Sequence, residues 1–370
     1  MHRGAIAEIN LSAIANNLHI VKDIVRYRPV IAVVKADAYG HGAIEVSKSL
    51  LKEGISHLAV AFIDEALELR NARIKAPIIV LFDRTDIKEF FRYNLIPVIH
   101  NMDMAVSFNK EANKHDKQIK VHVKIDTGMG RLGLYGKNVI QDLIRIGRMP
   151  GIELEGILSH FSEADLSDRS YADIQLNRFK KICKEVSKSL KKNLLLHIAN
   201  SAAVIAYKDA HLDAVRPGIM LYGYSPISTI NGEYFIRELI PAMTVKSKIL
   251  SIRKLSKGTP ISYGRTFVTK RTSRIGVIPV GYADGYNRLF SNNADMLVRG
   301  KRVPVVGRVC MDLTMIDLTD VKNATVDDEV IILGKQKDES IDAIELAQRV
   351  NTIPYEILTS IGSRSKRIYV

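Results

Sequence analysis

The sequence predicts an α/β protein with an N-terminal (β/α)8, TIM-like barrel and a C-terminal domain that is mainly β. Three observations predict this fold. From residue 30 to about residue 223, short β-branched runs alternate with longer amphipathic stretches. The runs number eight, as closure of a parallel barrel requires. Beyond about residue 225, Val, Ile and Thr runs are separated by Gly, Pro, Asn and Asp, which is typical of β-sheets joined by turns. We therefore expect a barrel domain over residues 1–230 and a β domain over residues 231–370.

The elements follow one another in a regular order. A short strand over residues 5–11, which could pair with the β domain or with the barrel, precedes a helix from about residue 12 to residue 26, with Ser12 as its candidate cap. The barrel strands are expected over residues 30–34, 58–62, 78–82, 96–99, 121–125, 154–158, 194–198 and 213–215. The β domain is expected to hold strands over residues 245–252, 275–280, 303–306, 314–318 and 330–333, and one clear helix over residues 341–350.

Composition excludes several classes of protein. The chain has 370 residues, is 46% hydrophobic and holds no apolar run long enough to span a membrane, so we expect neither disorder nor a membrane protein. The net charge is +14, but the lysines between residues 180 and 192 lie at helical spacing opposite apolar positions, as on a solvated helix face. Because no nucleic-acid-binding signature accompanies the charge, we predict no nucleic-acid partner.

The amino terminus and the cysteines favour a cytoplasmic protein. Residues 1–8 lack the apolar stretch and the small-residue cleavage site of a secretory signal. Cys183 and Cys310 are far apart and have no neighbouring cysteine, so neither a disulfide framework nor a metal-ligand spacing is present. We predict no bound metal.

Chemistry is expected at the carboxyl ends of the barrel strands, where such barrels place their active sites. Lys35 directly follows the first run, so desolvation would lower its pKa and make the neutral amine a nucleophile. The alternative is a lysine that extends from the strand tip into water. After the fifth run, Arg131 lies among three glycines that permit tight turns toward an anionic oxygen; a glycine-rich surface turn is the alternative.

The last three runs are also followed by chemically active side chains. His160 follows the sixth run, Ser201 opens a helix after the seventh, and Arg216 precedes Pro217 and Gly218 after the eighth. A serine at a helix start and the loops after strands seven and eight suit a phosphate. Taken singly, His160 could be a core residue, Ser201 an ordinary cap and Arg216 half of an ion pair. Together with Lys35 they favour a phosphate-bearing aldehyde held as a Schiff base, with pyridoxal phosphate as the leading candidate.

The motifs around these residues resemble those of the alanine racemases. Residues 34–42 resemble the pyridoxal-phosphate attachment segment of that family. Matching motifs follow in order over residues 124–131, 197–201, 216–219, 262–266, 281–286 and 307–312. The resemblance implies an isomerase that interconverts L-alanine and D-alanine with pyridoxal 5'-phosphate and supplies D-alanine for cell-wall peptidoglycan.

The resemblance also implies a two-base mechanism in a homodimer with shared active sites. Lys35 would carry the cofactor and act on one face of it, and Tyr263 of a second subunit would act on the other, so that the α-carbon is inverted. Arg216 would face the pyridine nitrogen, and His160 would link Arg216 to Tyr263 and favour its phenolate.

The remaining roles are carried over from the same motifs. Arg131 would contact the cofactor's phenolic oxygen and the substrate carboxylate, and Lys124 beside it is a candidate for carbamylation. The phosphate would be held by Tyr39, Ser201, Gly218, Ile219 and Tyr355. Met311 and Asp312 would line the carboxylate site, and Tyr282 would narrow the entrance. Read without the barrel motifs, Tyr263, Tyr282 and Asp312 would be a turn aromatic, a packed strand residue and a turn cap.

Three other functions were weighed against an alanine racemase. A racemase of broader amino-acid specificity differs only in the width of its pocket. A noncatalytic pyridoxal-phosphate carrier would be a barrel alone, and the long β domain with residues 262–265 argues against it. A decarboxylase on a similar barrel is disfavoured because the chain lacks the triple-glycine phosphate loop that such enzymes have.

Overall fold

The computed structural model describes residues 4–227, 229–230, 233–234, 239–362 and 364–370. It divides into two compact units. The barrel unit comprises Ile14–Ala38 and Ala43–Ile240, and the β unit comprises the described part of Met1–Ala13, Tyr39–Gly42 and Pro241–Val370. We predicted a domain boundary between residues 230 and 231. Residues 231–232 lie outside the described part of the chain.

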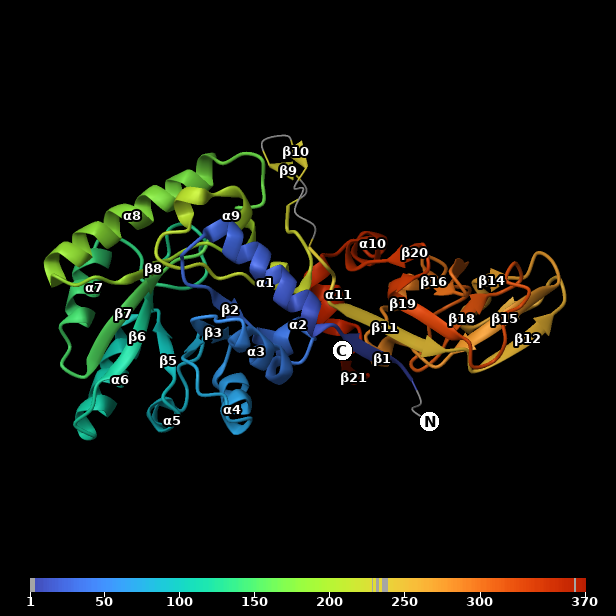
Figure 1. The fold of residues 1–370 in the computed structure, drawn as a ribbon, viewed down its shortest axis with the longest axis horizontal. Helices are drawn as coiled ribbons and strands as arrows, with labels where there is room; N and C mark the ends of the chain where they lie inside the picture. The colour runs from blue at the N-terminus through green and yellow to red at the C-terminus, as the bar shows by residue number, and fades with distance from the viewer. Residues whose placement is uncertain (1–3, 228, 231–232, 235–238, 363) are drawn as a thin grey trace. The chain divides into compact units, whose positions relative to one another are not determined.

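The barrel unit is built on a parallel sheet whose strands follow chain order from β2 to β8 (Figure 1). Its strands are β2 (Ile31–Val33), β3 (His57–Val60), β4 (Ile78–Val80), β5 (Ile96–Ile99), β6 (Ile119–Lys124), β7 (Ile152–Leu158) and β8 (Leu195–His197). Most of their residues are buried and many are β-branched, as expected of parallel strands covered on both faces. The predicted barrel is confirmed.

The eighth predicted strand, over residues 213–215, is reduced to a single bridge that closes the barrel. Val215 pairs in parallel with Val30, and its carbonyl accepts from the N–H of Ile31 at 2.9 Å. On the other side, the N–H of Arg216 donates to the carbonyl of Ala199 at 2.9 Å. Pro217 follows at once and has no N–H with which to extend a ladder, which accounts for the short pairing.

Amphipathic helices connect the strands of this unit. They are α1 (Leu11–Val25), whose first turn belongs to the β unit, α3 (Ala43–Lys52), α4 (Ile63–Asn71), α5 (Ile87–Arg92), α6 (Met102–Lys114), α7 (Val139–Gly147), α8 (Ser170–Leu190) and α9 (Ser201–Ala206). The short turns η1 (Lys208–Ala210) and η2 (Ile219–Tyr222) and the hairpin of β9 (Thr229–Ile230) and β10 (Glu233–Tyr234) complete it. No helix in the described ranges is long and apolar enough to cross a membrane.

The cap predicted for α1 is wrong. Ser12 is the second residue of the helix, and it is Asn10 whose side-chain oxygen accepts from the N–H of Ala13 at 2.9 Å. Asparagine is as good a helix cap as serine, so both candidates were compatible with the sequence. The hydrogen bonds of β1 decide between them, because the strand ends at Ile9 and leaves Asn10 at the cap position.

The β unit begins with the first strand of the chain. β1 (Ile6–Ile9) lies antiparallel to β11 (Met243–Lys248) and parallel to β21 (Lys366–Tyr369). The remaining strands of this seven-stranded sheet are β16 (Asp295–Val298), β17 (Lys301–Pro304), β19 (Glu329–Gln336) and β20 (Glu339–Ile341). The first strand of the chain thus belongs to the β unit.

A second sheet of the β unit carries its site-bearing loops. It consists of β12 (Ser251–Leu255), β15 (Ser273–Ile278) and β18 (Thr314–Asp317), next to the hairpin of β13 (Pro260–Ile261) and β14 (Phe267–Val268). Buried Ile261, Ile275 and Val306 form the core on which these strands pack.

Two predictions for the β unit are wrong. The single strand expected over residues 245–252 is two strands, because the chain changes sheets where Leu250 donates to the carbonyl of Val277. The unit also holds a second helix, α11 (Pro354–Ser360), after α10 (Ala343–Arg349). With only seven residues, α11 is too short to show helical periodicity, although Pro354 stands at the favoured first position.

Candidate active site

Lys35 stands directly after β2, at the start of a left-handed turn. This turn, α2 (Lys35–Tyr39), holds Ala36, Asp37 and Ala38 at φ of 52–53° and Tyr39 at 55°. None of the four is glycine, and each such residue costs about 1–2 kcal/mol in a left-handed helix. Strain of this kind persists only where the surroundings hold the backbone, and it gathers at functional sites. The backbone that presents Lys35 is therefore fixed at a cost in stability.

Two carboxylates hold the turn. Glu65, in the first turn of α4, accepts from the N–H of Ala36 at 2.6 Å and from the N–H of Ala61 at 2.6 Å. Asp37 accepts from the N–H of Ala43, the first residue of α3, at 2.7 Å. Our sequence analysis missed Glu65. The sequence does contain a signal for this role. Glu65 is the third residue of its helix, and a glutamate at that position can reach back to the backbone N–H groups that precede the helix.

Three cations surround the ring of Phe82, which follows β4. The Nζ atoms of Lys35 and Lys124 lie 5.5 and 5.8 Å from the ring centroid, and the guanidinium carbon of Arg131 lies 5.9 Å from it. Burial, with a smaller contribution from Arg131, lowers the pKa of the Lys35 amine. Burial and the charges of Arg131 and Arg216 lower the pKa of Lys124 to about 8. The sequence analysis missed Phe82, because an aromatic residue at the end of an apolar run looks like core.

The loop that carries Arg131 is organised around Asp126. Its carboxylate accepts from the backbone N–H groups of Gly128 at 2.8 Å and Arg131 at 3.0 Å. Burial alone would raise the pKa of Asp126, but these N–H donors lower it. Gly133 returns the chain to β6 at φ +127°, where a Cβ would lie 2.7 Å from the nitrogen of Asp126. The glycines thus serve a close backbone turn, and the guanidinium of Arg131 stands at its exposed edge.

Arg216 is buried and held by the ends of two strands. Its Nη1 donates to the carbonyl of His197 at 2.7 Å and to His197 Nδ1 at 2.8 Å. Nη2 donates to the carbonyls of Ser159 at 2.7 Å and Ile198 at 3.3 Å, and lies 3.4 Å from His160 Nδ1. Burial lowers the pKa of Arg216 to about 10, so it stays charged at neutral pH. Burial and Arg216 together hold the pKa of His160 well below its usual value, so this histidine is neutral.

Ser201 and the segment after Arg216 form a third feature of the barrel unit. Asn200, not Ser201, caps α9 by accepting from the N–H of Ala203 at 3.0 Å. The hydroxyl of Ser201 instead accepts from the N–H of Gly218 at 2.9 Å, which leaves its own hydrogen to be donated. Ile219 then begins η2, and the first N–H groups of a helical turn have no acceptor within it. The predicted phosphate residues Ser201, Gly218 and Ile219 are thus brought together.

The other two predicted phosphate residues lie in the β unit. The rings of Tyr39 and Tyr355 are 6.0 Å apart at centroid distance. Burial and the neighbouring Tyr355 raise the pKa of Tyr39, so its phenol is protonated and able to donate. Tyr355 is in the first turn of α11, the helix that the sequence analysis did not predict.

Tyr263 opens a short turn at the surface of the β unit. The turn η3 (Tyr263–Arg265) follows Ser262, whose hydroxyl donates to the carbonyl of Arg308 at 2.7 Å. Gly264 has a φ of +70°, and a Cβ there would lie 3.2 Å from the guanidinium of Arg308. Loops 262–265 and 308–310 are therefore tied together, yet the side chain of Tyr263 is 69% exposed.

The last three predicted residues are also on exposed loops of the β unit. Tyr282, in η4 (Tyr282–Asp284), and Met311 are 42% and 54% exposed, and the N–H of Tyr282 donates to the carbonyl of Cys310. Asp312 is paired with Arg364 at 3.1 Å. The tail that carries Arg364 thus contributes a cation that the sequence analysis did not assign.

The predicted residues are thus divided between the two units. In the barrel unit these are Lys35, Lys124, Arg131, His160, Ser201, Arg216, Gly218 and Ile219. In the β unit they are Tyr39, Tyr263, Tyr282, Met311, Asp312 and Tyr355.

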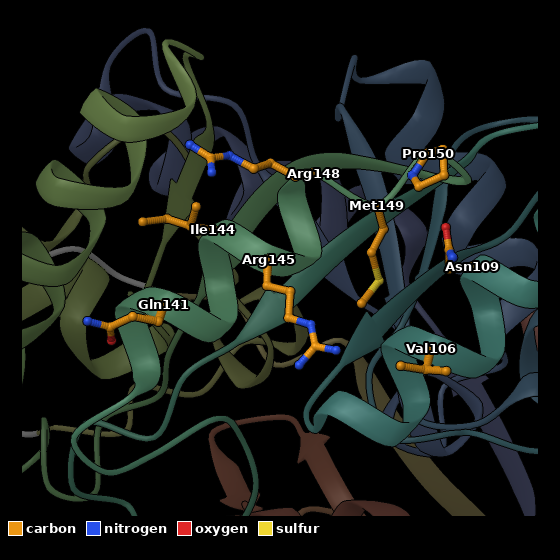
Figure 2. A pocket seen from close by; sticks show the side chains of 8 residues that line it. All are labelled: Val106, Asn109, Gln141, Ile144, Arg145, Arg148, Met149 and Pro150. Atoms are coloured by element: carbon orange, nitrogen blue, oxygen red, sulfur yellow. The ribbon is translucent and has the colours of Figure 1, made fainter.

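A groove on the outside of the barrel unit is separate from these groups. It has a volume of about 630 Å³ and lies between α6 and α7 (Figure 2). None of its lining residues is a predicted site residue; they are Val106, Asn109, Gln141, Ile144, Arg145, Arg148, Met149 and Pro150. Within the described part of the chain, no cluster of three or more His, Cys, Asp or Glu side chains could hold a metal ion.

The structure combines a closed parallel barrel, which has a half-buried lysine and a buried arginine at its strand ends, with a β unit. This architecture is typical of barrel-type enzymes. Family models sharpen this class. The model of the alanine racemase N-terminal domain matches residues 9–226, and that of the C-terminal domain matches residues 242–369. The chain belongs to the alanine racemase family, whose members depend on pyridoxal phosphate.

Individual relatives agree over the full length. The chain is 52% identical to an alanine racemase of Thermodesulfovibrio yellowstonii, covering 100% of this chain and 99% of the relative. It superposes on the alanine racemase of Bacillus anthracis with bound L-Ala-P at a TM-score of 0.93, with 36% identity and 100% and 96% coverage. It superposes on that of Bartonella henselae with covalently bound pyridoxal phosphate at 0.89, with 31% identity and full coverage of both chains.

Proposed function

We propose that this protein is an alanine racemase, which interconverts L-alanine and D-alanine and supplies D-alanine for peptidoglycan. The observation that carries the proposal is Lys35, an amine of lowered pKa that a left-handed turn presents at the strand ends of a family barrel. A neutral amine is the form that condenses with an aldehyde and later takes up a proton. The thiols of Cys183 and Cys310 are free, which fits a cytoplasmic location.

The residues of the barrel unit fit pyridoxal phosphate. When bound, this cofactor withdraws electrons from the substrate's α-carbon and makes its proton labile. Lys35 would bind the aldehyde, and Ser201, with a hydroxyl hydrogen to donate, would hold the phosphate together with Gly218 and Ile219. Arg216 would face the ring nitrogen as a donor that keeps its proton. In the β unit, the protonated phenol of Tyr39 and the nearby Tyr355 are the further phosphate ligands that the family motifs imply.

Inversion needs two proton-transfer groups on opposite faces of the α-carbon. Lys35 supplies one, and Tyr263 of a second copy of the chain supplies the other. The exposure of Tyr263 supports this assignment, because a large aromatic side chain that is 69% exposed on its own chain is free to enter a partner's site. The protein would then be a homodimer in which each site is completed by the partner.

Substrate recognition would rest on charge. Arg131 would pair with the substrate carboxylate, and Met311, Asp312 and Tyr282 of the partner would line and narrow the approach. We also propose that Lys124 is carbamylated. Its pKa of about 8 leaves part of the amine neutral at physiological pH, and a carbamate would neutralise part of the charge that it shares with Arg131.

The test is hydrogen exchange during turnover. Purified protein is incubated with pyridoxal phosphate and L-alanine in deuterated water, and D-alanine and α-deuterium are followed together. Both should appear; neither inversion nor exchange would refute the proposal. Serine, leucine and lysine as parallel substrates decide between an alanine racemase and a broad-specificity racemase. A carrier would bind pyridoxal phosphate with no exchange on any of them.

A further inference from the structure

A chain of buried polar side chains leads from Arg216 into the middle of the barrel. Arg216 Nη1 lies 2.8 Å from His197 Nδ1, and His197 Nε2 lies 2.7 Å from His122 Nδ1. His122 Nε2 lies 3.3 Å from a carboxylate oxygen of Glu155. The side chain of Glu155 is 23% exposed and also binds Lys120 at 2.8 Å, so the chain ends close to solvent. The four residues come from three strands and the closing segment of the barrel.

The hydrogen bonds of this chain can run in only one direction. An arginine donates and never accepts, so Nδ1 of His197 must be the unprotonated nitrogen. Nε2 of His197 therefore carries the hydrogen and donates to Nδ1 of His122. By the same step, Nε2 of His122 carries a hydrogen and donates to Glu155. Both histidines are thus neutral and in the Nε2–H tautomer, with a fixed cation at one end and a carboxylate at the other.

The charges around these four side chains favour the neutral state of both histidines. Burial lowers the pKa of both histidines, and Arg216 lowers them further. The bonds from His122 and, to a smaller extent, Lys120 lower the pKa of Glu155 to about 2, although burial opposes them. The other titratable groups close to the chain are His57 of β3, Lys120 of β6 and, near Arg216, His160 and Lys124. All are neutral or cationic at neutral pH. Of the described side chains that form this row, Glu155 is therefore the one carboxylate that balances Arg216.

The chain also determines which hydrogens of Arg216 remain available. His197 takes both hydrogens of Nη1, through its carbonyl and Nδ1. The carbonyls of Ser159 and Ile198 take those of Nη2. Among the described residues, the N–H of Nε has no acceptor, so it is the donor left for a ligand. A rotated His197 would release Nη1 and change which hydrogen is presented.

We propose that Glu155 and His122 are positioning residues for Arg216. From mid-strand positions on β7 and β6 they hold the ring of His197 in one orientation, and through it they fix the guanidinium with Nε presented at the strand ends. The inference rests on the proposed function for its catalytic consequence. Its structural core, the single direction of the hydrogen bonds, is independent of that function.

The first experiment reads the tautomers directly in the cofactor-free protein. Nitrogen-15 NMR of histidine-labelled protein distinguishes protonated from unprotonated ring nitrogens. We expect His122 and His197 to remain Nε2–H between about pH 5 and pH 8, where an ordinary histidine titrates. In Glu155→Ala, Arg216 still fixes both tautomers, but the Nε2–H of His122 loses its acceptor, so its nitrogen-15 signal should shift and broaden, and the signal of His197 should shift with it. An unchanged pattern in Glu155→Ala would overturn the proposal.

The second experiment measures racemisation by the same variants loaded with pyridoxal phosphate. Glu155→Ala should lose roughly 10–100-fold in kcat/KM, as removal of an outer-shell partner commonly does. Glu155→Gln keeps an acceptor for His122 and should lose less. Glu153→Gln, two residues earlier on β7, removes a carboxylate outside the chain and should behave as the wild type. Equal kcat/KM for Glu155→Ala and Glu153→Gln would contradict a positioning role.

The two readouts keep the failures apart. Suppose that the wild-type protein racemises no amino acid but that His122 and His197 are both in the Nε2–H tautomer. The proposed function then fails, and the inference about the four hydrogen-bonded side chains survives. If Glu155→Ala does not fold, Glu155→Gln decides: its His122 should keep the Nε2–H tautomer at neutral pH, and the pKa of His122 should fall below that in the wild type because the carboxylate that raises it is gone. Loss of the Nε2–H tautomer in a folded Glu155→Gln would count against the assigned direction.

Discussion

The site residues of the barrel unit and those of the β unit differ in how they are held. In the barrel unit, Lys124 and Arg216 are 3% and 6% exposed, and the guanidinium of Arg216 is hydrogen-bonded to the ends of two strands. In the β unit, Tyr263 and Met311 are 69% and 54% exposed, and it is their backbones, not their side chains, that are fixed. The barrel thus presents a preformed half-site. Under the proposed function, the side chains of the β unit act only when a second copy of the chain supplies the facing surface.

The largest expected effect is at Lys35, which both halves of the site require. Lys35→Ala removes the proposed covalent link and one proton-transfer group, so racemisation should fall by at least about 10³-fold. The visible absorbance of protein-bound pyridoxal phosphate should be lost as well. Retained absorbance after gel filtration, measured against a Lys35→Arg control, would show that the cofactor is not held through Lys35.

Tyr263 tests the second half of the comparison. Tyr263→Phe should lower racemisation by about 10²–10⁴-fold while the bound absorbance survives, because only one proton-transfer group is removed. Exchange of the α-hydrogen should collapse from one enantiomer only. If absorbance is lost instead, Tyr263 is a structural residue.

Mixing the two inactive variants sharpens this test. Subunits of Lys35→Ala and Tyr263→Phe that reassociate at random form hybrids in half of the dimers. Each hybrid has one site with both groups intact, so roughly a quarter of the wild-type activity should return. No recovery, in a mixture shown by mass spectrometry to contain hybrids, would contradict shared sites.

Burial of Lys124 predicts a dependence of stability on pH. The pKa of Lys124 is lowered from 10.5 to about 8, so between these values the unfolded chain binds more protons than the folded one. The free energy of unfolding should therefore gain up to about 3 kcal/mol from this group as the pH rises from about 8 to 10.5, and nothing below pH 8. Chemical denaturation of wild type and Lys124→Met, in buffers free of carbon dioxide, measures the difference. Parallel pH curves would refute it.

The turn at Gly133 should matter for stability. Gly133→Ala places a Cβ 2.7 Å from the nitrogen of Asp126 at φ +127°, which should cost about 1–3 kcal/mol in the free energy of unfolding. Gly130→Ala is the control, since nothing lies within 4 Å of its Cβ position and its φ is +69°. Thermal unfolding should therefore show the larger loss at Gly133, and the reverse order would contradict the account of the loop.

The smallest effect is expected at Phe82. Loss of the ring in Phe82→Leu removes its contact with Arg131, the cation proposed to pair with the substrate carboxylate. Such a contact is worth about 0.5–1 kcal/mol at an exposed site, so KM for alanine should rise a few-fold while the apolar bulk is retained. Phe91→Leu, on a helix of the same unit, is the control. Equal KM values for the two variants would leave Phe82 a packing residue.

Much of the barrel and of its site followed from sequence because strand ends of a parallel barrel share one rim. Residues placed after each apolar run, such as Lys35, Arg131 and Arg216, were bound to gather there. The left-handed turn after Lys35 could not be predicted, because four non-glycine residues give no local signal for positive φ. It depends on the distant carboxylate of Glu65. Roles in the β unit came only from motif resemblance, since exposed loops carry no periodic signal.

The pairing of β1 with β21 bears on how the chain is made. Ile9 and Lys366 are separated by 357 positions, and β1 pairs with β21 and with β11 but with no barrel strand. At a synthesis rate of about 5–20 residues per second, the first strand waits on the order of 20–70 s for its last neighbour. During this interval the barrel sequence can fold on the ribosome while a β-strand at its amino end has unpaired edges. Completion of the β unit therefore comes only after the whole barrel has been synthesised, and so does the assembly of any site that the unit shares.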